Sequence, residues 1–432
     1  MGIRQDNSLQ DRASRDDSLS GNMKAIIVVL GSSVALFWPG ALTFGFPGVM
    51  APVWQEMFHV GRGATGITIF FMSLAVWVFM FLVGHWQERY GTRKMITLGI
   101  ILTSFASVVV AYASSIYAVY AWAFLNGLAS SFVYIPTLTL VQWWYPEKKG
   151  VVSGIVSMVF GLSAAIMSPL FGKMLVSLGY VSMNLVIAVL TLTIGLAGAY
   201  FARAPDSSEN PASYSAMANR YSGKKPKSSG RPERSPDRSL TVLESLHTRS
   251  FWFLWMTWAF AGAAGVSMII LSTEYGLSKG FSLESAILLL TSFNLTNGTS
   301  RLISGYFSDK ISRNRIMSMA FMAAGLAYFT LPLADSLAAC AFLAAVVGFS
   351  FGTLFSVSAP LVADCFGLEH FGAVFGLTFA AYGFIAGPIG PTLSGYLLDV
   401  TGGNFSLVFL YLGVFCILSG VCIRFVRRPS LS

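Results

Sequence analysis

An arginine occurs in the middle of a long apolar stretch of this 432-residue sequence. Residues 286–310 read AILLLTSFNLTNGTSRLISGYFSDK, and Arg301 lies well inside both ends of that segment. Arginine at the centre of a membrane helix costs roughly 2.5–3.5 kcal/mol on insertion scales, so a chain that keeps one has a use for it. The other Arg and Lys residues can all be placed in loops, in tails or at helix ends.

Two asparagines share a helical face with this arginine. Asn294, Asn297 and Arg301 follow the spacing i, i+3 and i+7, which places them in one stripe. A guanidinium pairs bidentately with a carboxylate and stays charged at any relevant pH. We therefore interpret the stripe as an anion site in a transport pathway. Two alternatives remain open: Arg301 snorkels to a nearby membrane surface or braces a neighbouring helix, and Asn297 forms a helix–helix hydrogen bond.

The composition is that of a membrane protein. Hydrophobic residues make up 55% of the chain and charged residues only 11%, whereas a soluble globule has about a quarter charged residues. Mostly apolar segments of membrane-spanning length recur, which predicts an all-α protein with twelve transmembrane helices. The expected helices are 24–50, 66–86, 95–115, 116–143, 150–176, 182–203, 250–275, 283–307, 314–333, 337–363, 370–398 and 405–425.

The helices fall into two sets of six, separated by a change of composition. The expected division is a polar, unstructured tail (1–23), a first bundle (24–204), a flexible linker rich in Ser, Pro and basic residues (205–248), a second bundle (249–425) and a short tail (426–432). Basic residues concentrate in the linker, the tails and the loops of one side. The positive-inside rule therefore predicts cytoplasmic termini in a multi-pass protein of a cell membrane, such as a bacterial inner membrane.

Other classes of function find little support in the sequence. The four cysteines have no CxxC spacing and the four histidines form no ligand pair, so we expect no metal and no cofactor. There is no nucleophile–base constellation, no HExxH and no P-loop, so we do not expect an enzyme. The net charge of +9 follows from the basic loops and does not indicate nucleic-acid binding.

The two sets of helices are related by an internal repeat. The segment GVVSG at 150–154 corresponds to GAVFG at 372–376. The same offset of 222 residues relates Gly161 to Gly383 and Pro169 to Pro391. Two related six-helix halves imply a cavity at their interface, near mid-membrane, that opens to alternate sides as the halves rock.

Residues 24–425 resemble the major facilitator superfamily. GHWQERYGTR at 84–93 and its second copy at 305–313 resemble the loop motif that follows helices 2 and 8. Residues 294–311, NLTNGTSRLISGYFSDKI, resemble helix 8 of the oxalate/formate antiporters and monocarboxylate transporters, and WWYPEKKGVVSG at 143–154 resembles their helix 4–5 loop. This resemblance implies that Arg301 binds a substrate carboxylate, with Asn297 beside it.

The sequence departs from the oxalate carriers at one informative position. Their second cation, a lysine of helix 11, corresponds to Tyr382 here. One buried positive charge suits a monoanion better than a dianion. We therefore expect a secondary active transporter of small monocarboxylates, such as lactate or pyruvate. The resemblance implies proton coupling, although the sequence places no carboxylate at mid-membrane. An oxalate/formate-type exchanger and a non-transporting nutrient sensor stay open as alternatives.

Further residues are candidates for the site and for a gate. Tyr134 faces the cavity or packs as an ordinary aromatic, and Phe351, Phe355 and Phe379 form an apolar wall around a short alkyl chain or simply pack. The candidates for a cytoplasmic gate are Glu88, Arg89, Arg93, Asp309, Lys310 and Arg313. Their ion pairs would form in one state and break in the other, or they serve only as a topology signal. The expected partners are a small organic anion, a proton and the lipid bilayer, and the protein is expected to be a monomer.

Overall fold

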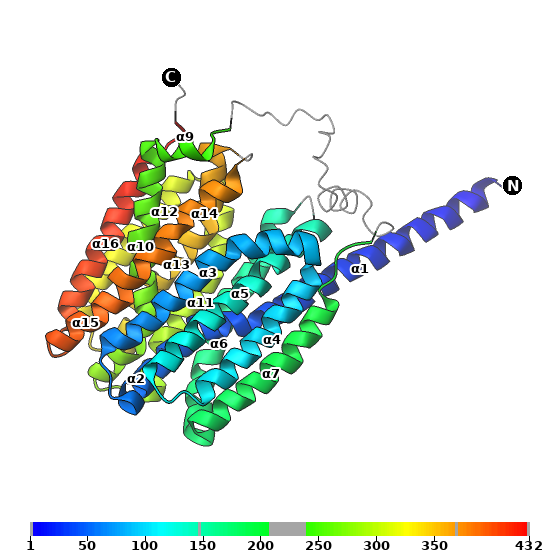
Figure 1. Ribbon diagram of the computed structural model, residues 1–432. Helices are drawn as coiled ribbons and strands as arrows, with labels where there is room; N and C mark the ends of the chain where they lie inside the picture. The colour runs from blue at the N-terminus through cyan, green and yellow to red at the C-terminus, as the bar shows by residue number, and fades with distance from the viewer. Residues whose placement is uncertain (1–2, 146–147, 207–238, 368–369, 430–432) are drawn as a thin grey trace.

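The structure, a computed structural model, describes residues 3–145, 148–206, 239–367 and 370–429. Its helices form two bundles that lie side by side (Figure 1). The first half contains α1 (Ile3–Phe44), α2 (Phe46–Phe58), α3 (Arg62–Tyr90), α4 (Thr92–Ala111), α5 (Ile116–Trp144), α6 (Lys149–Leu178) and α7 (Tyr180–Phe201). The second half contains α10 (Arg249–Ser278), α11 (Leu283–Lys310), α12 (Arg313–Thr330), α13 (Leu337–Phe366), α14 (Phe371–Ala381), α15 (Leu393–Val400) and α16 (Phe405–Phe425).

Eleven helical segments of the described chain are long and apolar enough to cross a membrane. The twelfth spanning helix is α11, whose asparagines, serines, threonines and arginine lower its hydropathy. It has 28 residues, about 42 Å at 1.5 Å per residue, which exceeds the roughly 30 Å of bilayer hydrocarbon. It packs against α6 and α13, which shield it. The prediction of twelve transmembrane helices in two bundles is confirmed.

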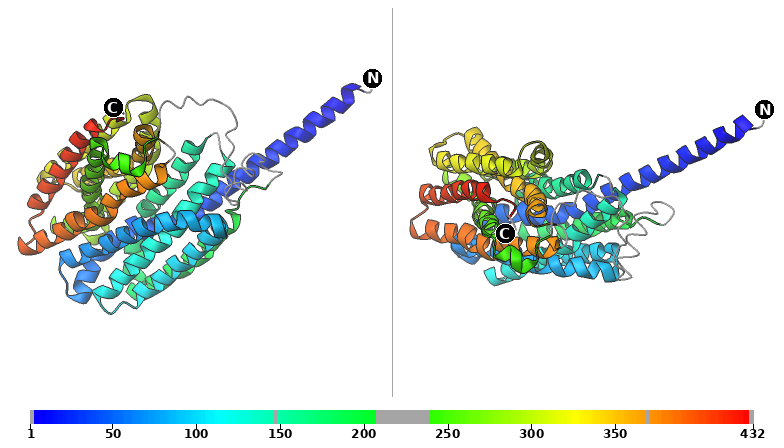
Figure 2. Two further views of the ribbon diagram at one scale, coloured as in Figure 1. Left: turned by 45° about the horizontal axis from the view of Figure 1, so that its top comes forward. Right: turned by 90° about the horizontal axis from the view of Figure 1, so that it is seen from above.

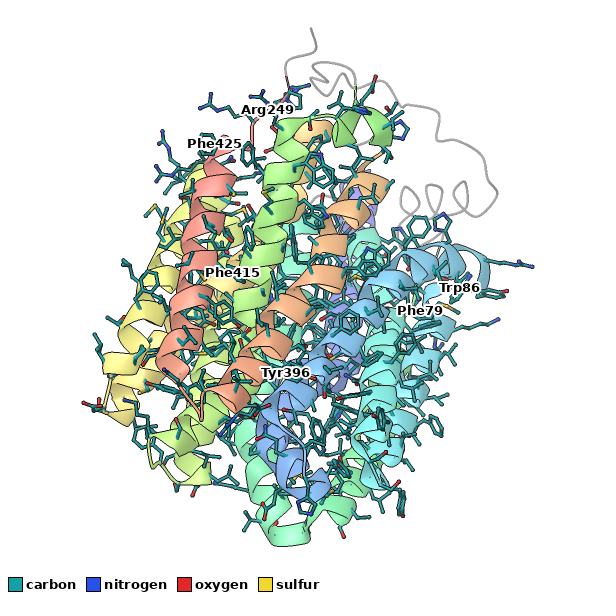
Figure 3. All side chains as sticks on the ribbon, turned by 60° about the vertical axis from the view of Figure 1, so that its left-hand side comes forward. Phe79, Trp86, Arg249, Tyr396, Phe415 and Phe425 are labelled. Atoms are coloured by element: carbon teal, nitrogen blue, oxygen red, sulfur yellow. The ribbon has the colours of Figure 1, made fainter. Side chains whose placement is uncertain are left out.

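The outer surface of the bundles is apolar, as a lipid-facing surface requires. Figure 3 shows aromatic side chains on the outside of the helices, among them Trp86, Tyr396 and Phe425. These three side chains are 36%, 50% and 54% exposed. In water such a surface would drive aggregation, whereas lipid tails solvate it at little cost.

The beginning of the chain differs from the prediction. Residues 3–22 continue the first membrane helix instead of forming an unstructured tail, and α1 extends beyond the bundle (Figure 2). This stretch has no proline, and a helix that continues an existing one needs no new nucleus. The expected helix 24–50 is divided in the structure: α1 ends at Phe44, and α2 begins at Phe46 with Pro47 in its first turn.

Most of the predicted linker, 207–238, lies outside the described residues, as do the last residues of the C-terminal tail, 430–432. The described end of the linker contains a short helix, α9 (Val242–Leu246), which the prediction missed. Thr241 and Glu244 cap the start of this helix with a capping box. This local signal was overlooked because the linker is polar overall.

The predicted helix 370–398 is interrupted by wide turns. Between α14 and α15 the chain forms two π-helical turns, η2 (Tyr382–Ala386) and η3 (Pro388–Thr392). Two prolines and three glycines in this region disrupt the regular hydrogen-bond ladder, and such turns frequently occur at functional sites. They place Tyr382 at the start of the irregular segment.

The halves meet closely where α6 crosses α11. A Cβ atom added at Gly298 would lie 2.7 Å from the backbone nitrogen of Leu162, and one at Gly161 would lie 2.7 Å from the Cα of Gly298. The crossing therefore requires glycine on both helices. It brings α6 of the first half against the helix that holds Arg301.

Substitution at this crossing should destabilise the protein. Gly298→Val forces the two backbones apart, and overpacking of this kind costs about 1–3 kcal/mol. We expect a clear drop in Tm in detergent. Gly305→Val, on the same helix with no atom within 4 Å of an added Cβ, is the matched control. Equal melting temperatures for the two variants would contradict the close crossing.

Candidate functional site

Arg301 lies at the interface of the halves and is 3% exposed. Its Nη1 donates a hydrogen bond to Ser157 Oγ on α6 at 3.0 Å. Its Nη2 donates to Asn297 Oδ1, one turn earlier on α11, at 3.4 Å. The guanidinium is therefore oriented by one residue from each half.

Aromatic rings surround the guanidinium. Its Cζ lies 4.9 Å from the ring centroid of Phe355, 5.6 Å from that of Phe44 and 5.9 Å from that of Phe160. Ring faces attract a cation but leave its charge uncompensated. This arrangement holds Arg301 in place without neutralising it.

The positive charge has no acidic partner in the described part of the chain, where no ion pair joins Arg301 to a carboxylate. Its Nε is buried without a hydrogen-bond partner, as is Asn297 Nδ2. A buried charge is costly unless it is paired. The site is therefore electrostatically suited to an anion.

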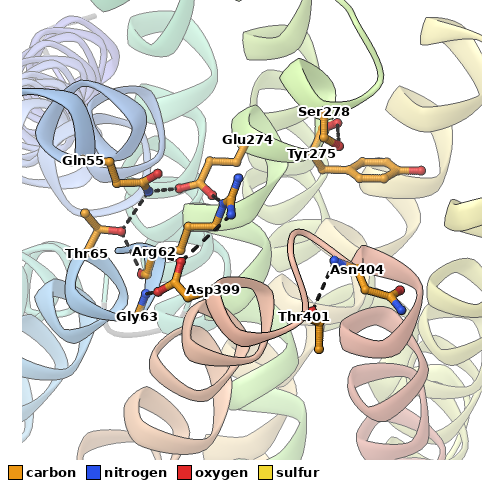
Figure 4. A network of polar contacts seen from close by, with 10 residues as sticks. All are labelled: Gln55, Arg62, Gly63, Thr65, Glu274, Tyr275, Ser278, Asp399, Thr401 and Asn404. Atoms are coloured by element: carbon orange, nitrogen blue, oxygen red, sulfur yellow. Dashed lines mark hydrogen bonds and ion pairs between the residues drawn. The ribbon is translucent and has the colours of Figure 1, made fainter. Parts of the chain in front are cut away.

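A cavity of about 1770 Å³ lies between the halves, and Arg301 is part of its wall. The lining continues to Gly84, Gly150, Gly305 and Gly372, close to the loops on the side where the C-terminus lies. We call this the termini side and the opposite end the far side. On the far side the halves are joined by polar contacts (Figure 4). The site is thus reached from the termini side.

The structure brings most of the predicted binding residues together. The cavity is lined by Arg301, Tyr134, Tyr382, Phe355 and Phe379. Tyr134 shares a hydrogen bond with Ser157 Oγ at 3.0 Å, so its hydroxyl belongs to the polar group around the guanidinium.

Three residues of the predicted site lie behind this wall. Asn297 and Asn294 are fully buried. Asn297 orients Arg301, whereas Asn294 Nδ2 donates to the carbonyl oxygen of Phe44 at 3.1 Å and so joins the halves. Phe351 packs against Phe355, with ring centroids 5.1 Å apart. In this conformation these residues support the wall instead of forming it.

The predicted gate residues lie on the termini side. Four make contacts inside their own half: Arg89 lies over Tyr90 (5.5 Å), Arg93 over Tyr200 (5.0 Å) and Lys310 over Tyr306 (4.4 Å), and Arg313 pairs with Asp364 (3.1 Å). The side chains of Glu88 and Asp309 lie outside the described part of the structure.

Sequence reasoning missed Ser157, Phe160 and Phe44. The internal repeat held a signal for two of them, because the offset of 222 residues relates Phe379 to Ser157 and Tyr382 to Phe160. Symmetry-related positions of the two halves thus face the same cavity. The same offset relates Phe44 to Val266, which also lines the cavity but was not among the predicted site residues.

The stability of a variant without this charge tests whether Arg301 is a structural brace. Arg301→Met keeps nearly the same volume and removes an unpaired buried cation, so we expect a gain of about 1 kcal/mol, or roughly 1 °C in Tm for a chain of this length. Arg62→Met, which deprives Glu274 of its cation, should lower the Tm. A comparable loss of stability in both variants would identify Arg301 as structural.

Comparison with known proteins finds relatives in sequence and in fold. The oxalate:formate antiporter of Oxalobacter formigenes is 24% identical over 304 residues, 69% of this chain and 67% of the relative. Monocarboxylate transporter 14 of Homo sapiens is 24% identical, covering 93% of this chain and 89% of the relative. A crystal structure of a bacterial homologue of the human lysosomal transporter Spinster, in an inward-facing and unoccupied conformation, matches the fold with a TM-score of 0.65 and 13% identity, covering 94% of this chain and 95% of that one.

A model of the Major Facilitator Superfamily matches residues 33–337 and 262–432, which together include both halves. The resemblance noted in the sequence is thereby confirmed across the fold. The protein is a multi-pass membrane protein, and its chain belongs to the major facilitator superfamily.

Proposed function

We propose that the protein is a secondary active transporter that moves small monocarboxylates of the lactate or pyruvate type by alternating access. The observation that supports this proposal most strongly is the buried guanidinium of Arg301, which faces the cavity between the halves without an acidic partner among the described residues. A substrate carboxylate would supply the missing charge and could accept two parallel hydrogen bonds.

The charge balance of the cavity favours a monoanion. Arg301 is the buried cation among the described lining residues, while Lys148 lines the mouth and is exposed. Tyr382, at the position of the oxalate carriers' second cation, has no charged group. It lies among aromatic rings, with its ring centroid 5.5 Å from that of Phe355. A dianion beside Arg301 would leave a net negative charge in a poorly solvated site.

The surroundings of Arg301 suit a small body with one polar substituent. Phe355, Phe379 and Tyr382 present an apolar wall to an alkyl group. The Ser157 hydroxyl bonds the guanidinium, the Tyr134 hydroxyl bonds Ser157, and both can bond a hydroxyl or keto oxygen of the substrate. Lactate and pyruvate have both features.

The proposed cycle follows from the topology. With the basic loops in the cytoplasm, as in a bacterial inner membrane, the described state is open to the inside. The halves, 24–204 and 249–425 with the linker 205–248, would then rock to expose Arg301 outside. In that second state, Glu88 and Asp309 are proposed to pair with the basic gate residues of the termini side.

Coupling to protons is part of the proposal. The proton would cross with the substrate beside Arg301. A second candidate is an oxalate/formate-type exchange, which the relative from Oxalobacter formigenes favours. A nutrient sensor with the same fold would bind the acid without moving it, so transport assays separate all three.

Uptake of labelled lactate into proteoliposomes tests the site. Arg301→Ala should lower uptake roughly 100-fold, because it removes charge-assisted hydrogen bonds to the carboxylate. Arg301→Lys should recover part of it, since the charge returns without the planar fork. Arg315→Ala, an exposed arginine of the same half, serves as the control. Unchanged uptake by Arg301→Ala would falsify the assignment.

The transport mode is tested with the same vesicles. An inward proton gradient should drive lactate accumulation in the wild type, and preloaded formate or oxalate should add little. If preloading with either anion accelerates entry of the other while the proton gradient has no effect, the protein is an exchanger and the proposal of proton-coupled transport is wrong. Binding of the acid without its transport would indicate a nutrient sensor.

A further inference from the structure

The far side of the cavity is closed by a compact polar cluster between the halves (Figure 4). Gln55 and Arg62 come from α2 and α3 of the first half, and Glu274 and Asp399 come from α10 and α15 of the second. We propose that these four residues form a latch that holds the far side shut in the described state, and that release of the latch lets the cavity open there. This inference depends on the carrier fold and not on the substrate.

The first element of the latch is an ion pair whose carboxylate is buried. Arg62 Nε lies 3.1 Å from Glu274 Oε2, and the Glu274 side chain is only 5% exposed. The other carboxylate oxygen accepts a hydrogen bond from Gln55, which also donates to Thr65 Oγ1 at 3.1 Å. Both donors to Glu274 thus come from the opposite half. Separation of the halves removes both at once.

The second element is a helix cap supplied by the opposite half. The N-cap residue of α3 is Gly61, which has no side chain to bond the first N–H groups of the helix. Asp399 fills this role: Oδ1 accepts from the Arg62 N–H and Oδ2 from the Gly63 N–H, each at 3.0 Å. A carboxylate at a helix N-terminus also interacts favourably with the helix dipole.

Glycines allow the two surfaces to approach this closely. A Cβ atom at Gly63 would lie 2.6 Å from the Tyr396 ring, and one at Gly395 would lie 2.4 Å from the backbone of Arg62. The start of α3 therefore fits against α15 only without side chains at these positions. This fit is independent of the charges, so the latch can be disturbed in two separate ways.

Another ion pair crosses between the halves on this side, but it is weaker. Lys173 and Glu284 are 3.9 Å apart, and their side chains are 68% and 78% exposed. Solvent screens such a pair, which contributes little. Lys279, by contrast, pairs with Asp335 of its own half at 3.2 Å. Among the described ionic contacts of the far side, the Arg62 cluster is therefore the one able to hold it shut.

Distances between spin labels on the far side test the latch. Met57→Cys on α2 and Ser406→Cys on α16 are exposed positions of opposite halves, labelled in a chain whose four native cysteines are replaced by alanine. We expect a mainly short distance without substrate. Arg62→Glu should lower the ratio of closed to open populations roughly tenfold or more. The charge swap Arg62→Glu with Glu274→Arg should restore most of the short distance.

Two further variants complete the test. Gly63→Val should open the far side without changing any charge. Lys279→Glu, the same charge reversal within one half, should leave the distances unchanged. The latch proposal is wrong if Arg62→Glu and Lys279→Glu give the same distance distribution. It is also wrong if the charge swap does not restore the short distance and Gly63→Val does not lengthen it. If thermal melting shows that Arg62→Glu does not fold, the distances in the charge-swap variant and in Gly63→Val test the proposal. Because no substrate is present, a failed lactate assay would not affect the result.

Discussion

The cost of keeping one guanidinium away from water governs the centre of this structure. A charge at this depth needs polar neighbours, which is why α11 is the helix whose own hydropathy does not suffice for a membrane span. That helix must then be shielded by others, and α6 can come close enough because glycines meet at the crossing. The neighbours satisfy only part of the guanidinium, since two hydrogen bonds and three rings leave its charge open.

The far side and the termini side of the molecule differ in the contacts made by their charged residues. On the far side, the buried Glu274 is paired with Arg62, Asp399 caps α3, and glycines allow the halves to fit closely, so separation leaves several polar groups without their partners. On the termini side, Arg93 rests on the ring of Tyr200 and Arg313 pairs with Asp364, each within its own half, and the cavity lining extends toward this side. Such an arrangement favours one state in the absence of substrate. In the proposed transport cycle, substrate binding would need to shift this balance by only a few kcal/mol to change the population.

The sequence alone predicted the twelve helices and the buried Arg301, because apolar length and helical spacing are local properties. It did not predict which residues meet across the halves. Ser157 and Arg301 are separated by 144 positions, and no local pattern relates them. The same limit applies to Asn297: spacing placed it on the face of Arg301, but only packing shows that it lies behind the wall. The continuous start of α1 was missed because polar composition says little about a helix that needs no nucleus of its own.

The cap that Asp399 provides for α3 also has a bearing on biosynthesis. The carboxylate lies 337 positions after the amide it binds. At about 5–20 residues per second, the ribosome needs roughly 20–70 s to deliver it. Throughout that interval the N–H groups of Arg62 and Gly63 must form hydrogen bonds with water or lipid headgroups instead of Asp399. The first half is therefore synthesised before α3 has its carboxylate cap, and translation of the second half supplies it.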